Sequence, residues 1–454
     1  MNGTRGLTAR ADGLLSVGRV QTPTLALVVA REDAIDAFVP EPYWEVQATL
    51  TAAAGRWTAR YIGPADAPPE AAPRDDAPPG PDGQRPEDRR GRLPSADAAA
   101  ALVAKLRGAD ARVTLAERDR QTVPPPLLHH LTSLQREANR RHRFTAARTL
   151  RAAQALYEQH KLITYPRTDS RHLTHDVAAG LPAVVAALTT GPWAQDARRI
   201  LQGPPPAIGK RIVDDSQVTD HHAIIPTALT PDLAKLGADE RAIYELIARR
   251  LLAALSPPAL YARTRLVTEA AGALLEARGR VRLEAGWEAV EPPQRTETKA
   301  ESKDKTPDDP ELPPVEAGDA ARVEDSRALA KQTRPPPRYT EASLLGAMER
   351  AGRDLDDAAL RAAMRDSGLG TPATRAAIVE TLVRRGYLDR DGRLMQPTPA
   401  GRALVAALPE DTLKSPRLTA EWERRLGLIA AGEADPSVFR RDIRRFVTEL
   451  VAAL

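Results

Sequence analysis

ALYARTRLVTEAAGALLEARGRVRLEAGWEAV, residues 259–290, alternates β-branched, aromatic and aliphatic residues with polar ones, with glycines between the runs. Such alternation is typical of neighbouring strands joined by turns. A second block of the same character, PEPYWEVQATLTAAAGRWTARYI, begins at residue 40. Helical patterns fill most of the chain between the two blocks. We therefore expect one β-rich domain that is split in the sequence and carries an inserted helical domain.

Two segments next to these blocks have a composition that cannot form a core. Residues 62–95 are rich in proline, glycine and charged residues, and residues 291–325 carry eleven acidic against five basic residues among prolines. Such segments cannot offset the entropy cost of ordering. We expect a disordered insertion at 62–95 and an acidic flexible segment at 291–325.

The helical centre has recognisable helix starts. LTSLQREANRRH begins with Thr132, Ser133 and Gln135 in the spacing of a capping box. Thr145 is expected to cap the next helix, in which apolar residues repeat at helical spacing. Tyr157 belongs to that repeat, and we interpret it as a core residue.

The C-terminal part predicts a further small domain. YTEASLLGAME and TPATRAAIVETLVRRG are typical of helices, with Thr340 and Thr371 as caps and Pro372 in the first turn of the second. YLDRDGRLMQPT then predicts a hairpin that turns at Asp391-Gly392. Helix, helix and hairpin is the order of a winged helix-turn-helix, which binds DNA in many proteins and only packs in others.

Composition limits the classes of function. The 454 residues suffice for about three domains. The chain has no cysteine, which excludes disulfides, thiolate catalysis and cysteine-ligated metal sites. Its apolar runs are too short to cross a bilayer, and its first residues lack the pattern of a signal peptide. We expect a cytoplasmic protein.

The positive charge is concentrated in the centre of the chain. From Pro126 to His175 there are nine Lys or Arg against three Asp or Glu, although the whole chain has a net charge of only +4. All eight histidines fall between His129 and His222. A basic, histidine-rich centre favours a polyanionic partner, and a solvated basic helix face is an equally open interpretation.

KLITYPRTDS, residues 161–170, raises the possibility of chemistry at a tyrosine. Pro166 disfavours the helical region at Tyr165, and the period of two in an extended segment puts Tyr165 and Arg167 on one side. A phenol with a pKa near ~10 becomes a nucleophile when a cation stabilises its anion or a base takes its proton. Arg167 also suits the oxygens of a phosphodiester. An isolated tyrosine of this kind is more often structural.

Two other stretches carry candidate phosphate-binding side chains. LSVGRVQTPTLALVVARE predicts Arg19 and Gln21 on one side of an extended segment, before a helix capped by Thr22. VTDHHAIIPT supplies His221 and His222 in a short apolar setting. A lone histidine pair is more often structural or half of a metal site. The chain contains no phosphate-binding loop of the form G-x-x-x-x-G-K-[ST].

Taken together, these stretches resemble the type IA DNA topoisomerases, and most closely their topoisomerase III-like branch. The matching pieces occur in the family's order along nearly the whole chain: LSVGRVQTPTLALVV, LTSLQREANRRHRF, ALYEQHKLITYPRTDSRHL, VTDHHAIIPT, RYTEASLLGAME, GLGTPATRAAIVETLVRRGYL and SPRLTAEWERRL. The resemblance implies transient cleavage of one DNA strand without ATP, with passage of another strand through the break.

The resemblance also implies roles for single residues. The family's Y-x-R tyrosine, here Tyr165, becomes joined to the 5′ phosphate of the broken strand. By the same match, Arg167 and His221 would act at the scissile phosphate. The DNA-binding positions implied by the match are Arg19, Gln21, His222 and Thr374.

The family's architecture is multidomain α+β and predominantly helical, with a split β-rich hinge domain that carries a helical domain in a toroidal core. We accordingly expect a helical domain with the catalytic tyrosine at 126–258. The other expected parts are a β-rich hinge domain at 39–125 and 259–337, and a winged-helix-like DNA-binding domain at 1–38 and 338–454.

Family members begin with a Toprim domain whose acidic residues bind Mg²⁺, and this chain starts just upstream of GRVQ. Asp354-Leu-Asp356 and Asp389-Arg-Asp391 have part of the acidic spacing, but neither is followed by the required glutamate. Mg²⁺ is thus implied by the family, with its ligands absent from the chain. We expect part of a longer enzyme, the product of a wrongly chosen start codon, or half of a split enzyme with a separate Toprim-containing polypeptide.

Three functions follow in order of preference. The first is a topoisomerase acting chiefly on single-stranded DNA. The second is a non-catalytic remnant that binds single strands with the same arginines and grooves. The third is a winged-helix regulator, which only residues 338–410 taken alone would favour.

Overall fold

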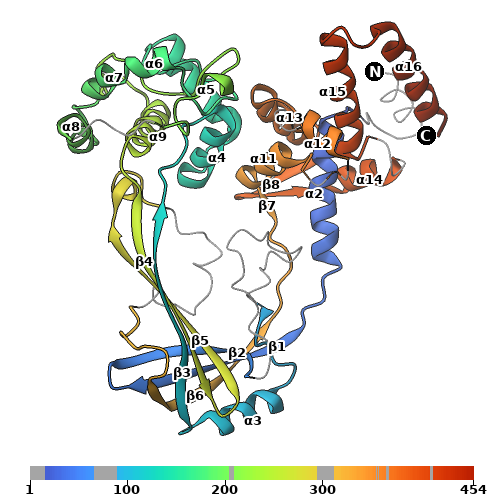
Figure 1. Ribbon diagram of the computed structural model, residues 1–454. Coiled ribbons are helices and arrows are strands. Elements are labelled where there is room, and N and C mark those ends of the chain that lie inside the picture. Colours follow the sequence, from blue (N-terminus) through green and yellow to red (C-terminus); the bar gives the residue numbers. More distant parts are fainter. Residues whose placement is uncertain are drawn as a thin grey trace. The chain divides into compact units, whose positions relative to one another are not determined.

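The computed structural model describes residues 16–65, 89–203, 209–293, 311–353, 355, 357–364, 368–408 and 413–453. The chain forms two compact units (Figure 1). Unit 1 combines Met1–Asp33, Pro126–Leu255 and Arg338–Leu454, and unit 2 combines Ala34–Pro125 and Ser256–Pro337. Unit 2 is thus built from two stretches that are far apart in the sequence.

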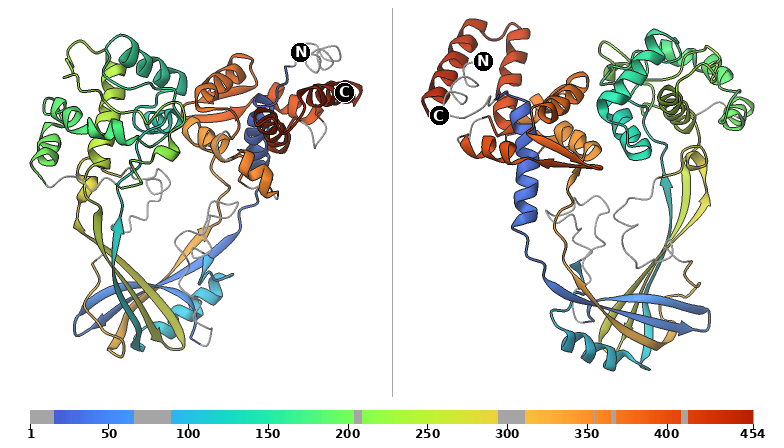
Figure 2. Two further views of the ribbon diagram at one scale, coloured as in Figure 1. Left: turned by 45° about the horizontal axis from the view of Figure 1, so that its top comes forward. Right: turned by 180° about the vertical axis from the view of Figure 1, so that it is seen from behind.

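Unit 2 is a closed antiparallel barrel whose strands follow the order β1-β2-β5-β4-β3-β6 (Figures 1 and 2). Its strands are β1 (Pro42–Ala52), β2 (Gly55–Pro64), β3 (Asp110–Val123), β4 (Ala259–Ala270), β5 (Ala273–Glu284) and β6 (Ala320–Gln332). Ala271 and Gly272 join β4 to β5 with φ values of 47° and 71°. A two-residue turn with both φ angles positive matches the twist of the strands it joins.

The barrel interior is apolar. Val46, Leu50, Leu266 and Leu275 have no exposed surface and belong to one core cluster. The helix α3 (Ala96–Leu106) adds Ala99 and Leu106 to the same cluster. The alternation read in the two β-rich blocks therefore reflects residues that point alternately into this core and away from it.

The structure differs from the expectation at the ends of the two segments expected to be disordered or flexible, 62–95 and 291–325. β2 continues to Pro64, and β6 begins at Ala320 inside the segment expected to be flexible. Val315 and Val323 of that segment are fully buried in the barrel core. Composition taken over the whole segment concealed the alternation that forms β6. The remaining parts, 66–88 and 294–310, lie outside the described residues.

The helical stretch of unit 1 contains α4 (Leu131–His142), α5 (Ala146–Glu158), α6 (His175–Ala179), α7 (Leu181–Ala187), α8 (Ala194–Gln202) and α9 (Ala238–Ala254). Thr145 caps α5 as predicted. The capping box of α4 was misplaced, because the helix begins at Leu131 and its cap is His130. His130 Nδ1 accepts from the Ser133 amide, and Ser133 Oγ accepts from the His130 amide.

The C-terminal stretch confirms the predicted helix, helix and hairpin. Its elements are β7 (Tyr339–Thr340), α11 (Glu341–Arg350), α12 (Ala358–Met364), α13 (Pro372–Arg384), β8 (Leu388–Asp391), β9 (Leu394–Pro397), α14 (Pro399–Ala407), α15 (Pro416–Ala430) and α16 (Pro436–Ala453). Thr340 caps α11, Thr371 precedes α13, and the short helix α12 was not predicted. The hairpin joins a sheet of order β7-β9-β8.

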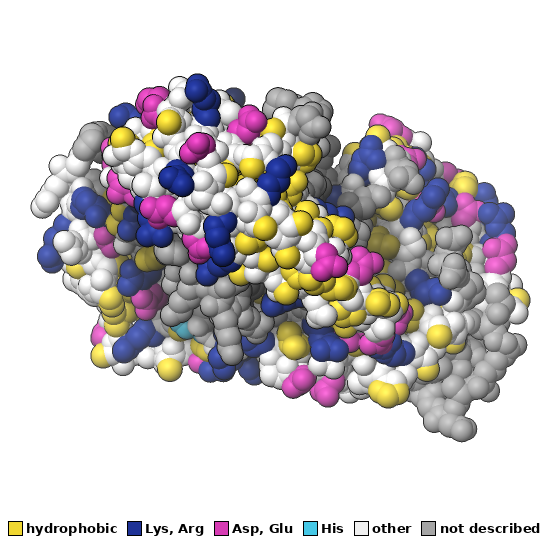
Figure 3. Space-filling model, turned by 90° about the horizontal axis from the view of Figure 1, so that it is seen from below, with side chains coloured by type: hydrophobic (Ala, Val, Ile, Leu, Met, Phe, Trp, Pro, Cys, Tyr) yellow, Lys and Arg dark blue, Asp and Glu magenta, His cyan; other side chains and the backbone are white. Residues whose placement is uncertain are grey.

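The helix α2 (Gln21–Asp36) belongs with this stretch although it lies near the start of the chain. Its residues Leu25 and Val28 share a buried cluster with Leu345 of α11 and Val379 of α13. None of the described helices combines the length and hydrophobicity needed to span a bilayer. On the molecular face in Figure 3, basic and acidic side chains are interspersed, with hydrophobic side chains between them.

Candidate active site

The tyrosine segment is tied to the segment that carries the histidine pair. The Thr164 amide donates to the Ile225 carbonyl at 2.9 Å, and Thr168 Oγ1 donates to the His221 carbonyl at 2.9 Å. These hydrogen bonds lie on either side of Tyr165. Because both partners are main-chain carbonyls of one strand-like segment, the backbone around the tyrosine is held in place.

The segment is extended, as the proline predicted. Leu162 and Ile163 are buried, which confirms the apolar stub before the tyrosine. From Pro166 to Ser170 every second residue is buried, whereas Tyr165 is half-buried and Arg167 is exposed. The phenol and the guanidinium therefore belong to the outward-facing side of one extended segment.

The Tyr165 ring is held between two other rings. Its centroid lies 4.4 Å from that of His221, with the planes at 47°, and 5.4 Å from that of Tyr157 in an edge-on arrangement at 75°. Tyr157 is half-buried, so its interpretation as a core residue was wrong. The helical period correctly put it on the inner side of α5, but that side meets the tyrosine segment there.

The two histidines differ in their surroundings. His221 is exposed and contacts the Tyr165 ring. His222 is half-buried, and its Nδ1 lies 2.8 Å from the Ala223 carbonyl, so this nitrogen carries the proton and donates. The structure therefore brings His221 to the tyrosine, and it ties His222 to the carbonyl of the next residue, Ala223.

Arg19 lies against α15. Its Nη2 is 2.6 Å from Glu423 Oε1, and its carbonyl accepts from Thr419 Oγ1 at 2.7 Å. Arg19 Nη1 is buried and has no hydrogen-bond partner. A buried guanidinium nitrogen without an acceptor is costly.

The predicted geometry around Gln21 was wrong. The helix α2 starts at Gln21, so Arg19 and Gln21 do not share an extended segment. Thr22 lies inside the helix, where its Oγ1 accepts from the Gly18 amide. Pro23 is tolerated in the first turn because the amides there have no intrahelical acceptor.

Gln21 and Thr374 belong to the same neighbourhood as Arg19. Gln21 Oε1 accepts from Arg385 Nη1 at 2.9 Å. Arg385 was not among the residues predicted from the sequence. A Cβ added to Gly370 would lie 3.1 Å from Thr374 Oγ1 and 3.3 Å from Val20. Within the described residues, no hydrogen bond, ion pair or ring contact joins this group to Tyr165.

A buried polar contact between α4 and the helices α11 and α13 was also missed. His130 Nε2 lies 3.1 Å and Arg136 Nη1 lies 3.4 Å from the carboxylate of Glu349. Arg375 Nη1 donates to Thr132 Oγ1 at 2.8 Å, and Arg375 is 1% exposed. The only sequence signal was that Arg375 directly follows Thr374 and that His130 directly precedes LTSLQ.

The charges of this contact follow from its hydrogen bonds. Burial alone would raise the pKa of Glu349, but the hydrogen bond from His130, the charge of His130 and the guanidinium groups of Arg375 and Arg136 lower it to about 2. Burial lowers the pKa of His130 despite its carboxylate partner. Above its lowered pKa His130 is neutral, and it then accepts at Nδ1 from Ser133 and donates from Nε2 to ionised Glu349.

Comparison with known proteins decides which family this arrangement belongs to. A family model described as DNA topoisomerase matches residues 1–441. The chain belongs to the type IA DNA topoisomerase family. It is 36% identical over 455 residues to "DNA topoisomerase 3" of Bacillus subtilis, covering 99% of this chain and 58% of that protein. It is 37% identical over 426 residues to "DNA topoisomerase 3" of Vibrio cholerae, covering 94% and 62%.

The resemblance to topoisomerase III is thus confirmed at the level of the family. The chain spans about three-fifths of these relatives, since it covers 58% and 62% of their lengths. Full-length topoisomerase I from Thermotoga maritima has the same fold, with a TM-score of 0.67 and 23% identity. That match covers 98% of this chain and 65% of the other, and it supports a mixed α+β fold of the topoisomerase type.

Type IA topoisomerases use Mg²⁺, and the described residues do not fit a site for it. Within them, no group of three or more His, Cys, Asp or Glu is placed to hold a metal ion. Asp389 Oδ1 accepts from the Arg390 amide, and Asp391 Oδ2 accepts from Gln396. Both carboxylates therefore accept hydrogen bonds within the β8–β9 hairpin. Asp354 and Asp356 lie outside the described residues.

Proposed function

We propose that this chain provides the strand-cleaving part of a topoisomerase III-like enzyme, which breaks and rejoins one DNA strand without ATP through a 5′-phosphotyrosine at Tyr165. The observation that supports it best is the contact of the Tyr165 ring with His221, on a segment whose outward side also carries exposed Arg167. The membership of the family supports the same assignment.

The proposed reaction is a balanced exchange of ester bonds. Tyr165 Oη forms a bond to phosphorus, the bond from phosphorus to the 3′ oxygen breaks, and that oxygen ends as a hydroxyl with the proton that the phenol gave up. One phosphodiester replaces another, so the step needs no oxidant and no nucleotide. Reversal rejoins the strand.

The neighbouring residues have distinct parts in this proposal. Arg167 holds the phosphoryl oxygens as negative charge builds on them, because a guanidinium can donate two parallel hydrogen bonds. His221 keeps the ring in position and contributes a donor at the phosphate. Arg19 contacts the cleaved strand through the part of its side chain that stays exposed beside Glu423. Gln21, His222 and Thr374 support binding of that strand.

The domains also receive proposed roles. The barrel of unit 2 acts as the hinge region, the helical stretch carries the tyrosine, and the C-terminal stretch with α2 acts as a winged-helix-like DNA-binding domain. Strand passage requires the tyrosine-bearing part to move away from the part that holds the other end of the break. We expect this chain by itself to bind single strands and to relax supercoiled DNA poorly until a Toprim-containing polypeptide is added.

The decisive experiment mixes the protein with a radiolabelled single-stranded oligonucleotide and stops the reaction with denaturant. We expect a covalent protein–DNA adduct for the unchanged chain and its complete loss in Tyr165→Phe, because the substitution removes only the nucleophilic oxygen. Tyr157→Phe is the matched control and keeps the adduct. Salt-sensitive binding without any adduct would instead point to a non-catalytic single-strand-binding protein.

A further inference from the structure

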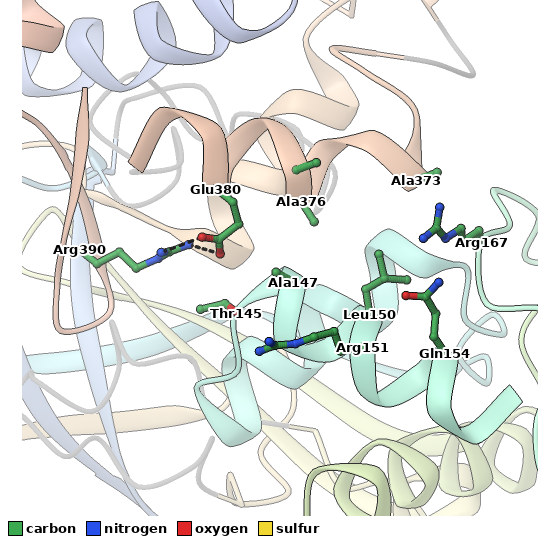
Figure 4. Close-up of a pocket in the computed structure, with 11 residues that line it drawn as sticks. Thr145, Ala147, Leu150, Arg151, Gln154, Arg167, Ala373, Ala376, Glu380 and Arg390 are labelled. Atoms are coloured by element: carbon green, nitrogen blue, oxygen red, sulfur yellow. Dashed lines mark hydrogen bonds and ion pairs between the residues drawn. The ribbon is translucent and has the colours of Figure 1, made fainter. Parts of the chain in front are cut away.

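An open trench runs beside the tyrosine segment between α5 and α13 (Figure 4). Its volume is about 640 Å³, within the range of roughly 300–1,000 Å³ typical of ligand sites. Arg167 and Gln154 lie at one end, and the ion pair of Glu380 with Arg390 lies at the other. The trench therefore begins at a residue of the Y-x-R motif.

The walls of the trench are apolar and carry small side chains. Leu150 and Ala147 line it from α5, and Ala373, Ala376 and Ala377 line it from α13. The alanines leave the space between the two helices open, where larger residues would fill it. Such surfaces suit a flat aromatic group, whose faces need no hydrogen bonds.

The charges of the trench favour an anion. Arg151 and Arg167 are exposed, and neither has an ion pair with an acidic side chain in the described part of the chain. Glu380 pairs with Arg390, whose Nη2 lies 2.7 Å from Glu380 Oε1 and 3.4 Å from Glu341 Oε2. Arg151 and Arg167 thus supply the positive charge of the trench that no ion pair holds, although the hydrogen bond from Arg148 and, after it, the charge of Arg151 lower the pKa of Asp239. The amide of Gln154 adds a donor and an acceptor.

We propose that this trench binds one nucleotide of the DNA strand next to the cleavage site, with its base between α5 and α13. The base stacks against the aliphatic walls, the Gln154 amide meets its edge, and the flanking phosphates pair with Arg151 and Arg167. This inference rests on the proposed function and goes further, because it assigns a base-binding subsite to residues outside the motifs.

The test scans one abasic sugar along a fluorescent single-stranded oligonucleotide and measures affinity by anisotropy. All proteins carry Tyr165→Phe, so that no covalent adduct accumulates. We expect the abasic sugar to weaken binding about tenfold at one position, since a stacked base contributes on the order of 1–3 kcal/mol. In Ala377→Trp, which fills the trench, the intact oligonucleotide binds about tenfold more weakly and the abasic penalty disappears at that position.

A second variant and a control protect the test against misfolding. Gln154→Ala is expected to remove part of the penalty at the same nucleotide, and Ala183→Trp, at an exposed alanine of α7, to leave it unchanged. An unchanged penalty in both trench variants, with single-strand binding intact, overturns the subsite alone. Failure of every variant and of the parent protein to bind single strands overturns the proposed function together with the subsite.

Discussion

The interior of the barrel in unit 2 and the contact of α4 with α11 and α13 in unit 1 are both buried, but the first is made of apolar side chains and the second of polar and charged ones. The barrel encloses apolar side chains such as Leu50 and Leu266, and continuous strand pairing closes it. The α4 contact buries Arg375 and places His130 against Glu349. When the surfaces of the α4 contact separate, water can take the place of the lost hydrogen-bond partners. Water offers no such replacement for the apolar contacts inside the barrel.

The difference indicates which part of the molecule persists and which part can open. Separating apolar surfaces costs free energy in proportion to the area exposed, whereas a typical hydrogen bond contributes a net ~0.5–1.5 kcal/mol. Interfaces between the domains of one chain resemble transient interfaces between proteins, which are more polar than permanent ones. We therefore expect the barrel to stay closed while the α4 contact forms and breaks.

The largest effect is expected from Leu50→Ala in the barrel. Leu50 has no exposed surface, and removing a buried leucine side chain costs about 2–5 kcal/mol. Hydrogen exchange should speed up in all six strands together, because they close one ring. Leu283→Ala is the control, since Leu283 of β5 is 48% exposed and should exchange at the parent rate. Equal effects of both changes would contradict an apolar core as the stabilising feature.

A smaller and more local effect is expected from Arg375→Met. The substitution leaves Thr132 without its donor and Glu349 with less positive charge, at a cost of about 1–3 kcal/mol. Exchange should rise in α4 and α11 and remain unchanged in the barrel strands.

Combining Arg375→Met with Glu349→Gln sharpens the comparison. Because the two groups interact, the double change should cost less than the sum of the single changes. Simple additivity would show that the buried charges do not form one contact.

The α4 contact should also weaken as the pH falls. The folded pKa of His130 is lowered, so the stability it contributes is present above its unfolded value near ~6.5 and is lost as the pH falls through the folded value. Glu349 acts in the same direction, between its unfolded value near ~4.3 and about 2. Burial raises the pKa of Glu341, so the stability that this carboxyl group contributes changes with pH in the opposite direction and is lost as the pH rises.

Hydrogen exchange of α4 at pH 7 and pH 5 measures this dependence. His130→Asn keeps a residue that can cap the helix and removes the titration, so the difference between the two pH values should shrink. Burial also lowers the pKa of His129, so part of the pH dependence should remain in this variant. An unaltered difference in His130→Asn would exclude His130 as the titrating group.

The smallest effect is expected at the surface of unit 1. Arg148 makes two hydrogen bonds of 2.7 Å to Asp239, but both side chains are exposed. Exposed ion pairs contribute little because water and salt screen them. Asp239→Asn should leave urea unfolding and the exchange of α4 unchanged, and a clear loss would mean that surface pairs rival the buried polar contact.

Local patterns predicted much of the fold and of the tyrosine segment. The caps Thr145 and Thr340, the hairpin at Asp391-Gly392 and the extended course of Tyr165 to Arg167 depend on neighbours in the sequence, and all were predicted. The start of α2 and the strand β6 were not. The helix α2 begins before the predicted cap because the Thr22 amide already donates to the Gly18 carbonyl. The strand β6 forms despite its polar, acidic composition because it pairs with β1 and β3.

The sequence by itself determined the order of the elements, the motif around Tyr165 and the family. These depend on side-chain periodicity and on residues adjacent in the chain, which can be read without a structure. Only the tertiary structure decided that the rings of His221 and Tyr157 lie against Tyr165, that Arg375 is buried beside Thr132, and that Arg167 opens onto a trench between α5 and α13. The reason is physical: such contacts join segments far apart in the chain, and the burial of distant surfaces fixes them.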